Sequence, residues 1–229
     1  MVESIDSYRL ISRALNEEIS GDVLDVGNGG VFNYDVGQAT RIVVVDIASE
    51  LSQRTDWPPN AEFRWGGATE LPVEDGSFDT CLLQLIVHHL AETSYSVTRR
   101  RSRAAIQEAF RAVRPGGKVV VLESCLPAAW EQAERCLFPA FRFVLQRINH
   151  PLVFQWSAAS LVAFMQQTGL ERVRNQNVPL GRWVIQLGVK WPTALTPVRV
   201  HKIVGYKSSE ATVAASESRS ASEPTRGAE

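Results

Sequence analysis

The chain has few cysteines, no long apolar run and almost no net charge. Its 229 residues contain three cysteines, and 24 lysines and arginines face 25 aspartates and glutamates, a net charge of −1. The cysteines show no metal-type spacing, so we expect no metal site and expect Cys81 and Cys125, near apolar runs, to be reduced core thiols. A near-neutral chain has no general attraction to nucleic acids or acidic membranes. With no run near the roughly 18 apolar residues of a membrane span and no signal-peptide core, we expect a cytoplasmic protein with neither a nucleic-acid nor a membrane partner.

Short apolar runs recur along the first half of the chain. They are continuous rather than alternating, which is typical of strands buried on both faces of a parallel sheet. A length of 229 residues suits one domain with a substantial core. The sequence therefore predicts an α/β domain, with strands at Val23–Val26, Ile42–Val45, Phe63–Trp65, Cys81–Val87 and Val119–Leu122.

Helical segments are expected between and around these strands. Apolar spacing predicts an N-terminal helix within residues 1–20 and another over 97–113, which ends at the Arg114–Gly117 segment. Ser157 or Ser160 is expected to cap a further helix, because serine side chains accept hydrogen bonds from free backbone N–H groups.

The second half of the chain has a different composition and hydrophobic pattern. Residues 125–156 are too long for a simple crossover and too aromatic to lie in water, so we expect one or two helices that form a lid over a pocket. Residues 170–206 are expected to form two or three strands. Residues 207–229, rich in serine, alanine and glutamate, are expected to be a disordered tail. We therefore interpret residues 1–206 as one domain.

The first apolar run ends in a glycine-rich turn, and the second ends on an acid. Glycines at 27, 29 and 30 let the backbone approach a ligand closely, and Asp46 can accept hydrogen bonds from a ribose. This pattern favours a nucleoside-bearing cofactor. A dinucleotide fingerprint would need glycine at position 32, where Phe32 stands, which lowers the case for a nicotinamide-dependent reductase.

Four further motifs follow in order, Gly66–Pro72, Asp75–Asp79, His88–Leu90 and Phe110–Gly117. Together they resemble those of the class I S-adenosylmethionine-dependent methyltransferases, most closely the small-molecule branch with ubiquinone-type and natural-product enzymes. The resemblance covers about residues 20–206. It implies a Rossmann-like fold whose seven-stranded, mostly parallel sheet has an antiparallel last strand and helices on both faces. It also implies S-adenosyl-L-methionine as the cofactor.

The resemblance assigns the cofactor site to the ends of the first, second and fourth strands. Asp25 and the glycine turn would hold the methionine end, and Asp46 the ribose. The alternatives are that Asp25 only accepts backbone N–H groups of the turn and that Asp46 is a helix cap. The implied cofactor-binding residues are Asp25, Gly27, Asn28, Gly29, Asp46, Ile47, Gly67, Ala68, Leu83 and Gln84.

Two histidines follow the fourth strand, at the edge where open α/β sheets bind ligands. The pKa of histidine suits proton removal near neutral pH, and neighbouring residues point in different directions, so we expect one of His88 and His89 to face the pocket. Some related natural-product methyltransferases pair tandem histidines with an acid at the end of the fifth strand, which here is Glu123. The alternative for the histidines is a buried or capping role.

The aromatic lid is expected to line the acceptor pocket, through at least one of Trp130, Phe138, Phe141 and Trp156. We therefore expect methyl transfer to a small organic acceptor, a secondary metabolite, by in-line displacement with a histidine base. The alternative is a non-catalytic cofactor-binding or scaffold protein on the same fold. That alternative is motivated by Val31 and Gly67, where the family usually has glycine and often has aspartate. The sequence leaves open the acceptor, the methylated element and the choice between monomer and homodimer.

Overall fold

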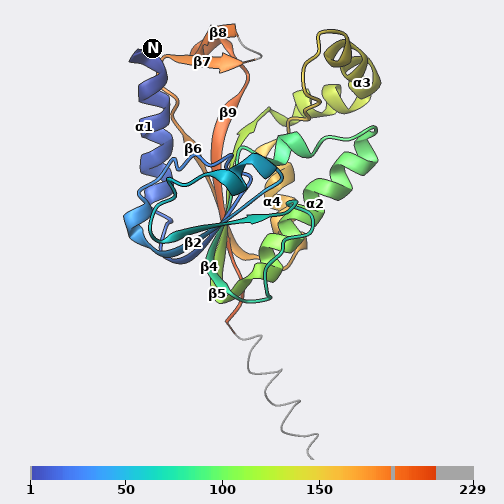
Figure 1. Ribbon diagram of the computed structural model, residues 1–229. Coiled ribbons are helices and arrows are strands. Elements are labelled where there is room, and N and C mark those ends of the chain that lie inside the picture. Colours follow the sequence, from blue (N-terminus) through green and yellow to red (C-terminus); the bar gives the residue numbers. More distant parts are fainter. Residues whose placement is uncertain (1, 187–188, 210–229) are drawn as a thin grey trace, which may run out of the picture.

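The computed structural model describes residues 2–186 and 189–209, which form an α/β structure around a seven-stranded sheet (Figure 1). Its strands are β1 (Gly21–Val26), β2 (Ala39–Asp46), β3 (Ala61–Trp65), β4 (Phe78–Gln84), β5 (Val113–Cys125), β6 (Glu171–Val178) and β9 (Arg199–Tyr206). They lie in the order β3-β2-β1-β4-β5-β9-β6. β1 to β5 run parallel, whereas β9 pairs antiparallel with β5 and β6. The predicted fold class is confirmed, including the antiparallel last strand.

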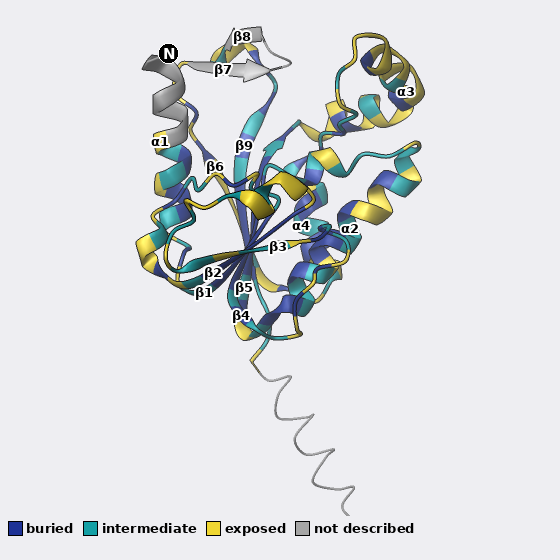
Figure 2. Ribbon diagram, in the orientation of Figure 1, coloured by how far each residue is buried: buried dark blue, intermediate teal, exposed yellow. Residues whose placement is uncertain are grey.

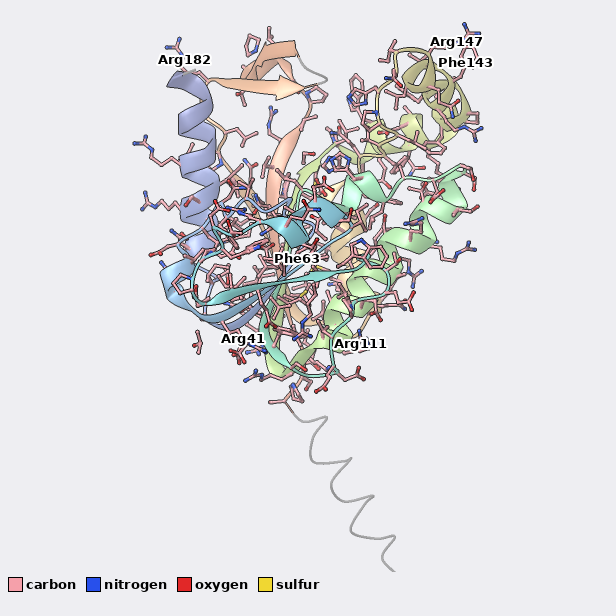
Figure 3. The ribbon with its side chains drawn as sticks, viewed as in Figure 1. Arg41, Phe63, Arg111, Phe143, Arg147 and Arg182 are labelled. Carbon is pink, nitrogen blue, oxygen red and sulfur yellow. The ribbon has the colours of Figure 1, made fainter. Side chains whose placement is uncertain are left out.

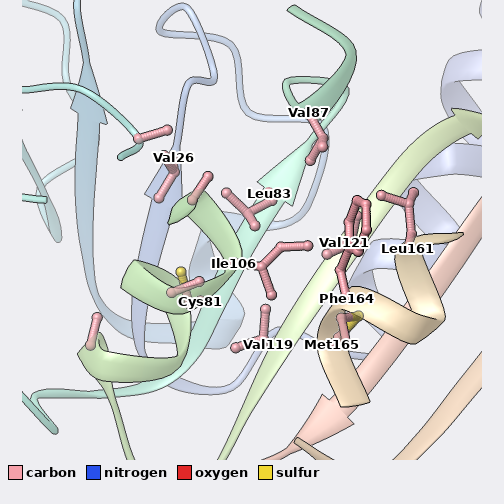
Figure 4. Close-up of a cluster of buried hydrophobic side chains, with 14 of the residues drawn as sticks. Val26, Cys81, Leu83, Val87, Ile106, Val119, Val121, Leu161, Phe164 and Met165 are labelled. Carbon is pink, nitrogen blue, oxygen red and sulfur yellow. The ribbon is translucent and has the colours of Figure 1, made fainter. Parts of the chain in front are cut away.

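Helices cover both faces of the sheet, namely α1 (Val2–Asn16), α2 (Tyr95–Ala112), α3 (Ala128–Arg147) and α4 (Ala158–Gln167). Val121 of β5 packs in one core cluster with Ile106 of α2 and Phe164 of α4 (Figure 4). The next residue, Leu122, packs in a second cluster with Leu15 of α1. Both faces of the central strands are therefore buried, as Figure 2 shows in dark blue, which explains why their sequences are continuous apolar runs.

Local signals set several helix ends as predicted. Ser157 is the cap of α4 and accepts a hydrogen bond from the Ser160 backbone N–H at 3.2 Å. Gly169 follows that helix with a φ of +102°, a conformation that favours glycine. Four short 3-10 helices complete the described structure, η1 (Val36–Gln38), η2 (Ser49–Gln53), η3 (Val87–Leu90) and η4 (Thr193–Leu195).

A buried lysine joins the last strand to the first helix. Lys202 of β9 is 3% exposed, and its Nζ donates to the Ala14 carbonyl at 3.0 Å. The same Nζ lies 2.6 Å from Glu17 Oε2 and 3.0 Å from Glu18 Oε1. The two carboxylates compensate the buried charge, so this contact fixes α1 against the sheet.

Three sequence-based boundaries were wrong. β5 begins at Val113 instead of Val119, because Val113 already pairs with Phe78 of β4, and the Arg114–Gly117 segment then bulges before the pairing resumes at Lys118. β4 ends at Gln84, and Val87 already belongs to η3. Residues 170–206 form four described strands instead of two or three, since β7 (Trp183–Gln186) and β8 (Val189–Pro192) pair as a separate antiparallel sheet.

Lys207, predicted to begin the tail, is bonded to β5. The backbone N–H of Lys207 donates to the Gly117 carbonyl at 2.9 Å, and its Nζ donates to the Val113 carbonyl at 2.8 Å. The predicted disorder of residues 210–229 falls outside the described residues. Among the residues that are described, no helix has the length and apolarity needed to cross a membrane.

Candidate active site

The glycine turn after β1 opens the carboxyl edge of the sheet. Gly27, Gly29 and Gly30 have φ values of +72°, +60° and +78°, which side chains rarely adopt. A Cβ on Gly27 would lie 2.0 Å from Ile86 Cδ1, so the turn packs tightly against the segment after β4. A Cβ on Gly29 would meet nothing within 4 Å. The turn therefore presents bare backbone to open space, as a closely approaching ligand requires.

Asp46, at the end of β2, ties this turn to the neighbouring strand. One carboxylate oxygen accepts the Gly29 backbone N–H and the other accepts that of Ala48, both at 2.9 Å. The side chain is 9% exposed. Each oxygen keeps a second lone pair, so these bonds leave Asp46 able to accept from a hydroxyl group as well.

Asp25, at the end of β1, is fully buried and incompletely bonded. Its Oδ2 accepts from Asn28 Nδ2 and from the Tyr34 hydroxyl, each at 2.8 Å, whereas Oδ1 has no hydrogen-bond partner among the described residues. Burial raises the pKa of Asp25 to about 6, and the charge of Asp46 adds to that rise, against the two hydrogen bonds. An unpaired buried carboxylate oxygen is costly, so this atom marks a place where a donor is missing.

A second unpartnered acceptor lies on the adjacent strand. Gln84 at the end of β4 is 7% exposed, and its Oε1 is also without a partner among the described residues. The register pairs Asp25 with Leu82, two residues before Gln84, so Asp25 and Gln84 lie on the same face of neighbouring strands. Both unpartnered oxygens thus belong to side chains on one face of the sheet near its carboxyl edge.

Tyr34 is a site residue that the sequence did not reveal. It lies after the turn, is 6% exposed, and its hydroxyl fixes one oxygen of Asp25. No motif marks it. The only signal is an aromatic residue within a short polar segment, which does not show where a hydroxyl points.

The other expected cofactor residues have varied surroundings. Asn28 braces the turn, with its Oδ1 accepting the Gly30 N–H at 2.7 Å. Gly67 forms an isolated bridge with Glu70. Ala68 and Leu83 are buried at 8% and 1%, whereas Ile47 is 72% exposed. Leu83 belongs to the core cluster, and Ile47 stands at the surface beside the end of β2.

His88 and Glu123 form a close pair at the ends of β4 and β5. His88 Nδ1 lies 2.7 Å from Glu123 Oε1, and Glu123 Oε2 accepts the His88 backbone N–H at 3.2 Å. Glu123 is 0% exposed, and its Oε1 also accepts the Ser124 N–H at 2.8 Å. Burial alone would lower the pKa of His88, but the charge and hydrogen bond of Glu123 outweigh it and raise that pKa. The carboxylate therefore fixes the ring and makes it more basic.

His89 lies in different surroundings. It is exposed at the surface, and its ring centroid lies 4.0 Å from that of His88. Partial burial and the neighbouring His88 lower the pKa of His89. Both histidines belong to η3, a single turn that brings the ring of His88 into contact with Glu123.

The four aromatic residues of the lid do not gather around one cavity. Phe138 and Trp156 are buried at 2% and 0%, while Trp130 and Phe141 are exposed at 57% and 45%. Trp156 packs 4.6 Å from the ring of Phe154 and donates from Nε1 to the Ser102 hydroxyl at 3.2 Å. A cavity of about 240 Å³ between the starts of α3, α4 and β9 is lined instead by Cys125, Leu126, Pro127, Ala128, Ser157, Ala158, Ala159, Pro197, Arg199 and His201.

The described residues contain no candidate metal site. No group of three or more histidine, cysteine, aspartate or glutamate side chains is arranged there to hold an ion. The described cysteines, Cys81, Cys125 and Cys136, are free thiols, two of them buried.

Comparisons with known proteins give the site its context. A family model described as a methyltransferase domain matches residues 24–121, which include the turn and the His88–Leu90 motif. The ubiquinone/menaquinone biosynthesis C-methyltransferase UbiE of Rubrivivax gelatinosus is 26% identical over 75% of this chain and 70% of that protein. The demethylmenaquinone methyltransferase of Lactobacillus johnsonii is 24% identical over 71% of this chain and 66% of that protein.

Solved structures agree on the fold. A chain in the complex between the Haloferax volcanii Trm112 methyltransferase activator and a methyltransferase has a TM-score of 0.62, with 17% identity over 88% of this chain and 90% of that chain. The YcgJ protein of Bacillus subtilis has a TM-score of 0.57, with 17% identity over 88% and 98% of the two chains. At such identities the likeness concerns the fold alone, whereas the domain match and the named relatives concern the activity. The chain thus carries a methyltransferase domain over residues 24–121, and its named relatives support an S-adenosylmethionine-dependent methyltransferase of the small-molecule type.

Proposed function

We propose that this methyltransferase acts on a small organic acceptor whose proton is removed by His88, with Glu123 as the positioning residue. The observation that carries the proposal is the 2.7 Å contact between His88 Nδ1 and the fully buried Glu123. A carboxylate that accepts the Nδ1 hydrogen leaves Nε2 as the basic atom of a neutral imidazole. A histidine held in this way at the carboxyl edge of the sheet suits general-base work.

We propose that residues with different hydrogen-bonding states bind different parts of the cofactor. The unpartnered Asp25 Oδ1 and Gln84 Oε1 would accept from the cofactor's ammonium group, which brings three N–H donors and a positive charge. The free lone pairs of Asp46 would accept from the ribose hydroxyls, and the open backbone at Gly29 allows close approach. When bound, S-adenosylmethionine supplies a methyl group on a cationic sulfur and a neutral leaving group.

The remaining residues orient the acceptor and exclude water. Phe154 packs against Trp156 and donates its backbone N–H to the His88 carbonyl at 3.0 Å, so the lid segment seals one side of the histidine. Positioning of this kind lowers barriers by roughly 7–11 kcal/mol in favourable cases.

The proposed acceptor is a hydroxyl-bearing aromatic ring, either a quinol or a secondary metabolite. A 29% identical relative in Leishmania donovani is named a 2-methoxy-6-polyprenyl-1,4-benzoquinol methylase, and this chain spans 64% of it. A phenolic hydroxyl has a pKa of about 10, within reach of an imidazole base, and its deprotonation activates either the oxygen or the ring carbon.

The test compares His88→Ala with His150→Ala, a matched loss of a histidine whose Nδ1 lies 2.8 Å from the Pro151 carbonyl oxygen. Turnover is followed with a panel of quinols and catechols, and binding of S-adenosylhomocysteine by calorimetry. We expect His88→Ala to lose about 10²- to 10⁴-fold in kcat with little change in cofactor affinity, while His150→Ala retains turnover.

Equal turnover by His88→Ala and the unmodified protein would remove the base role. Binding of the cofactor without turnover on any acceptor would support the non-catalytic alternative. A folded protein that binds neither S-adenosylmethionine nor S-adenosylhomocysteine would contradict the whole assignment.

A further inference from the structure

The cavity between the starts of α3, α4 and β9 has no role in the proposed function, and none of the four predicted lid aromatics lines it. Its lining is mostly apolar or small, with Leu126, Pro127 and Pro197 among the larger side chains. Its volume of about 240 Å³ is slightly below the roughly 300 Å³ at which most ligand sites begin. The cavity therefore suits a small organic molecule.

Arg199, at the start of β9, lines this cavity with a guanidinium that the protein uses only in part. Its Nη1 donates to the carbonyls of Thr196, Val198 and Thr193, at 2.6, 2.8 and 3.3 Å. A guanidinium has five N–H groups, and those on Nη2 and Nε have no partner in the described part of the chain. The carbonyls therefore fix one end of the guanidinium and leave the rest for a ligand.

The charge of Arg199 also has no counter-charge, in contrast to that of Lys202 on the same strand. Lys202 Nζ lies 2.6 Å from Glu17 Oε2 and 3.0 Å from Glu18 Oε1. Within the described ranges, Arg199 bonds only to carbonyl oxygens. The planar fork of a guanidinium matches a carboxylate, which can accept two parallel hydrogen bonds from it. Arg199 is therefore suited to bind an anion from outside the protein.

His201 lines the cavity two residues further along β9 and adds a neutral acceptor. Its Nδ1 lies 2.8 Å from Asn175 Oδ1, an atom that only accepts, so Nδ1 carries the hydrogen and Nε2 keeps a lone pair. Burial lowers the pKa of His201, so the ring is neutral near pH 7. Arg147 lies at the opposite end of α3 and points away from the body of the molecule (Figure 3). Among the ten lining residues, Arg199 therefore carries the one formal charge, which matches a monoanion.

Two carboxylates lie close to the cavity without lining it. Burial and the charges of Glu123 and Glu131 raise the pKa of the Cys125 thiol, which is part of the lining. Glu131 accepts the Ser157 backbone N–H at 2.8 Å, and Glu123 is bonded within the catalytic pair described above. Protein donors thus engage both carboxylates, and Arg199 decides the sign of charge that the cavity accepts.

We propose that this cavity binds a small organic acid, with Arg199 on its carboxylate and the apolar walls around its carbon skeleton. His201 Nε2 accepts a hydrogen bond from a hydroxyl or N–H group of the same molecule. An inorganic anion fits less well, because it leaves the apolar lining uncovered. The inference goes beyond the proposed function and does not depend on it.

The carboxylate has two sources, a substituent of the methyl acceptor or a separate molecule. The register pairs His201 with Glu123 and Arg199 with Cys125, so the cavity lies beside the strand end that carries the proposed catalytic pair. Residues two apart along a strand are separated by about 7 Å, a distance comparable to the span of a substituted benzene ring. The experiment therefore includes one arm for each source.

The test measures binding of 3,4-dihydroxybenzoate and 3,4-dihydroxybenzamide to the full chain by calorimetry. The two probes have the same shape, but only the benzoate carries a negative charge. We expect the benzoate to bind about tenfold more tightly, because hydrogen bonds between charged groups are the stronger ones. Arg199→Gln should lose this preference. Ala128→Phe, which adds a ring at an exposed lining position, should weaken the binding of both probes.

The matched control is Arg100→Gln, which removes an exposed guanidinium of α2 and should bind both probes like the unmodified chain. Thermal unfolding shows whether each variant is folded. Ala128→Phe leaves the carbonyl contacts of Arg199 in place, so it tests the cavity even if Arg199→Gln does not fold.

A turnover assay with the same two probes distinguishes the sources. If the benzoate is methylated and Arg199→Gln raises its KM but not that of the benzamide, the carboxylate belongs to the acceptor. If turnover is absent or insensitive to Arg199→Gln while binding of the benzoate still requires Arg199, the acid is a separate ligand. The proposal is overturned if the benzoate binds no better than the benzamide, or if Arg199→Gln or Ala128→Phe binds it as tightly as the unmodified chain does.

Discussion

Two carboxylates at the same edge of the sheet, Asp25 and Glu123, are both 0% exposed but have opposite bonding states. Both oxygens of Glu123 are bonded within the protein, to His88 and Ser124. Asp25 has one oxygen without a partner among the described residues, and burial raises its pKa to about 6. A carboxylate that is fully bonded can position a neighbour in the free protein. One that is incompletely bonded can accept a further hydrogen bond from a ligand or from a bound water.

The largest effect is expected from Glu123→Gln, which removes the charge of the satisfied carboxylate while keeping its shape. Without that charge the pKa of His88 falls, because burial then dominates. The acid limb of the pH profile of kcat/KM should therefore move to lower pH, and kcat should fall on the order of 10²-fold.

A steady-state pH series measures both effects. Glu134→Gln is the control, since Glu134 is a partly buried carboxyl outside the His88–Glu123 pair, and burial and the charge of Glu131 raise its pKa to about 7. This control should leave the limb in place. If the acid limb of the kcat/KM profile does not move in Glu123→Gln, the role of Glu123 is structural only.

Asp25→Asn changes the incompletely bonded carboxylate and should have an intermediate effect. It should stabilise the folded protein and weaken cofactor binding. The pKa of Asp25 in the folded protein, about 6, lies above its unfolded value of 3.8, so its contribution to stability is lost as the pH rises through this window. Removing the charge should raise the free energy of unfolding at pH 7 by about 2–3 kcal/mol. The same change should weaken cofactor binding roughly 10- to 100-fold, because the ammonium loses its counter-charge.

Urea unfolding between acidic and neutral pH gives the first quantity and calorimetry the second. The stability difference between Asp25→Asn and the unmodified chain should grow with pH and level off above about pH 6. A variant that is less stable at neutral pH, or one that binds the cofactor with unchanged affinity, would contradict the interpretation of Asp25 as a site awaiting a donor.

The smallest effect is expected from Gln84→Met, which keeps the length of the side chain and removes the second orphan oxygen. Gln84 is neutral, so its bond to an ammonium should contribute only about 1 kcal/mol, a several-fold loss of cofactor affinity. The folded protein should become slightly more stable, because a buried group without a partner disappears. Calorimetry and thermal unfolding detect both changes, and an affinity equal to that of the unmodified chain would show that Gln84 makes no such bond.

The positions of the parallel strands were predictable because buried parallel strands leave local marks in the sequence. Runs such as Ile42–Val45 are continuous since both faces of the sheet are covered, and the family motifs lie at fixed strand ends. The β7–β8 pair was not predicted, because a short hairpin outside the main sheet lacks that continuous burial. β5 started earlier than predicted, because Val113 pairs with β4 ahead of a bulge whose proline and glycines resemble a turn in the sequence.

The candidate site was predictable by residue type and not by orientation. The tandem histidines and an acid at the end of β5 were found by resemblance, but only the turn geometry of η3 showed that His88 meets Glu123. Tyr34 left no pattern. Trp156 and Trp130 looked alike in the sequence, yet one is completely buried and the other 57% exposed, because packing over α2 and α4 decides their burial.

The contact between Lys202 and α1 has a consequence for N-terminal deletions. The three partners of the Lys202 ammonium, the Ala14 carbonyl and the carboxylates of Glu17 and Glu18, all precede the sheet in the chain. A deletion up to Gly21 would remove all three partners together with Ile11, Leu15 and Ile19, which cover the same face of the sheet, so Lys202 and this apolar face would become exposed to solvent. The first helix is therefore an integral part of the domain, and a shortened protein should not be expected to fold around the remaining strands.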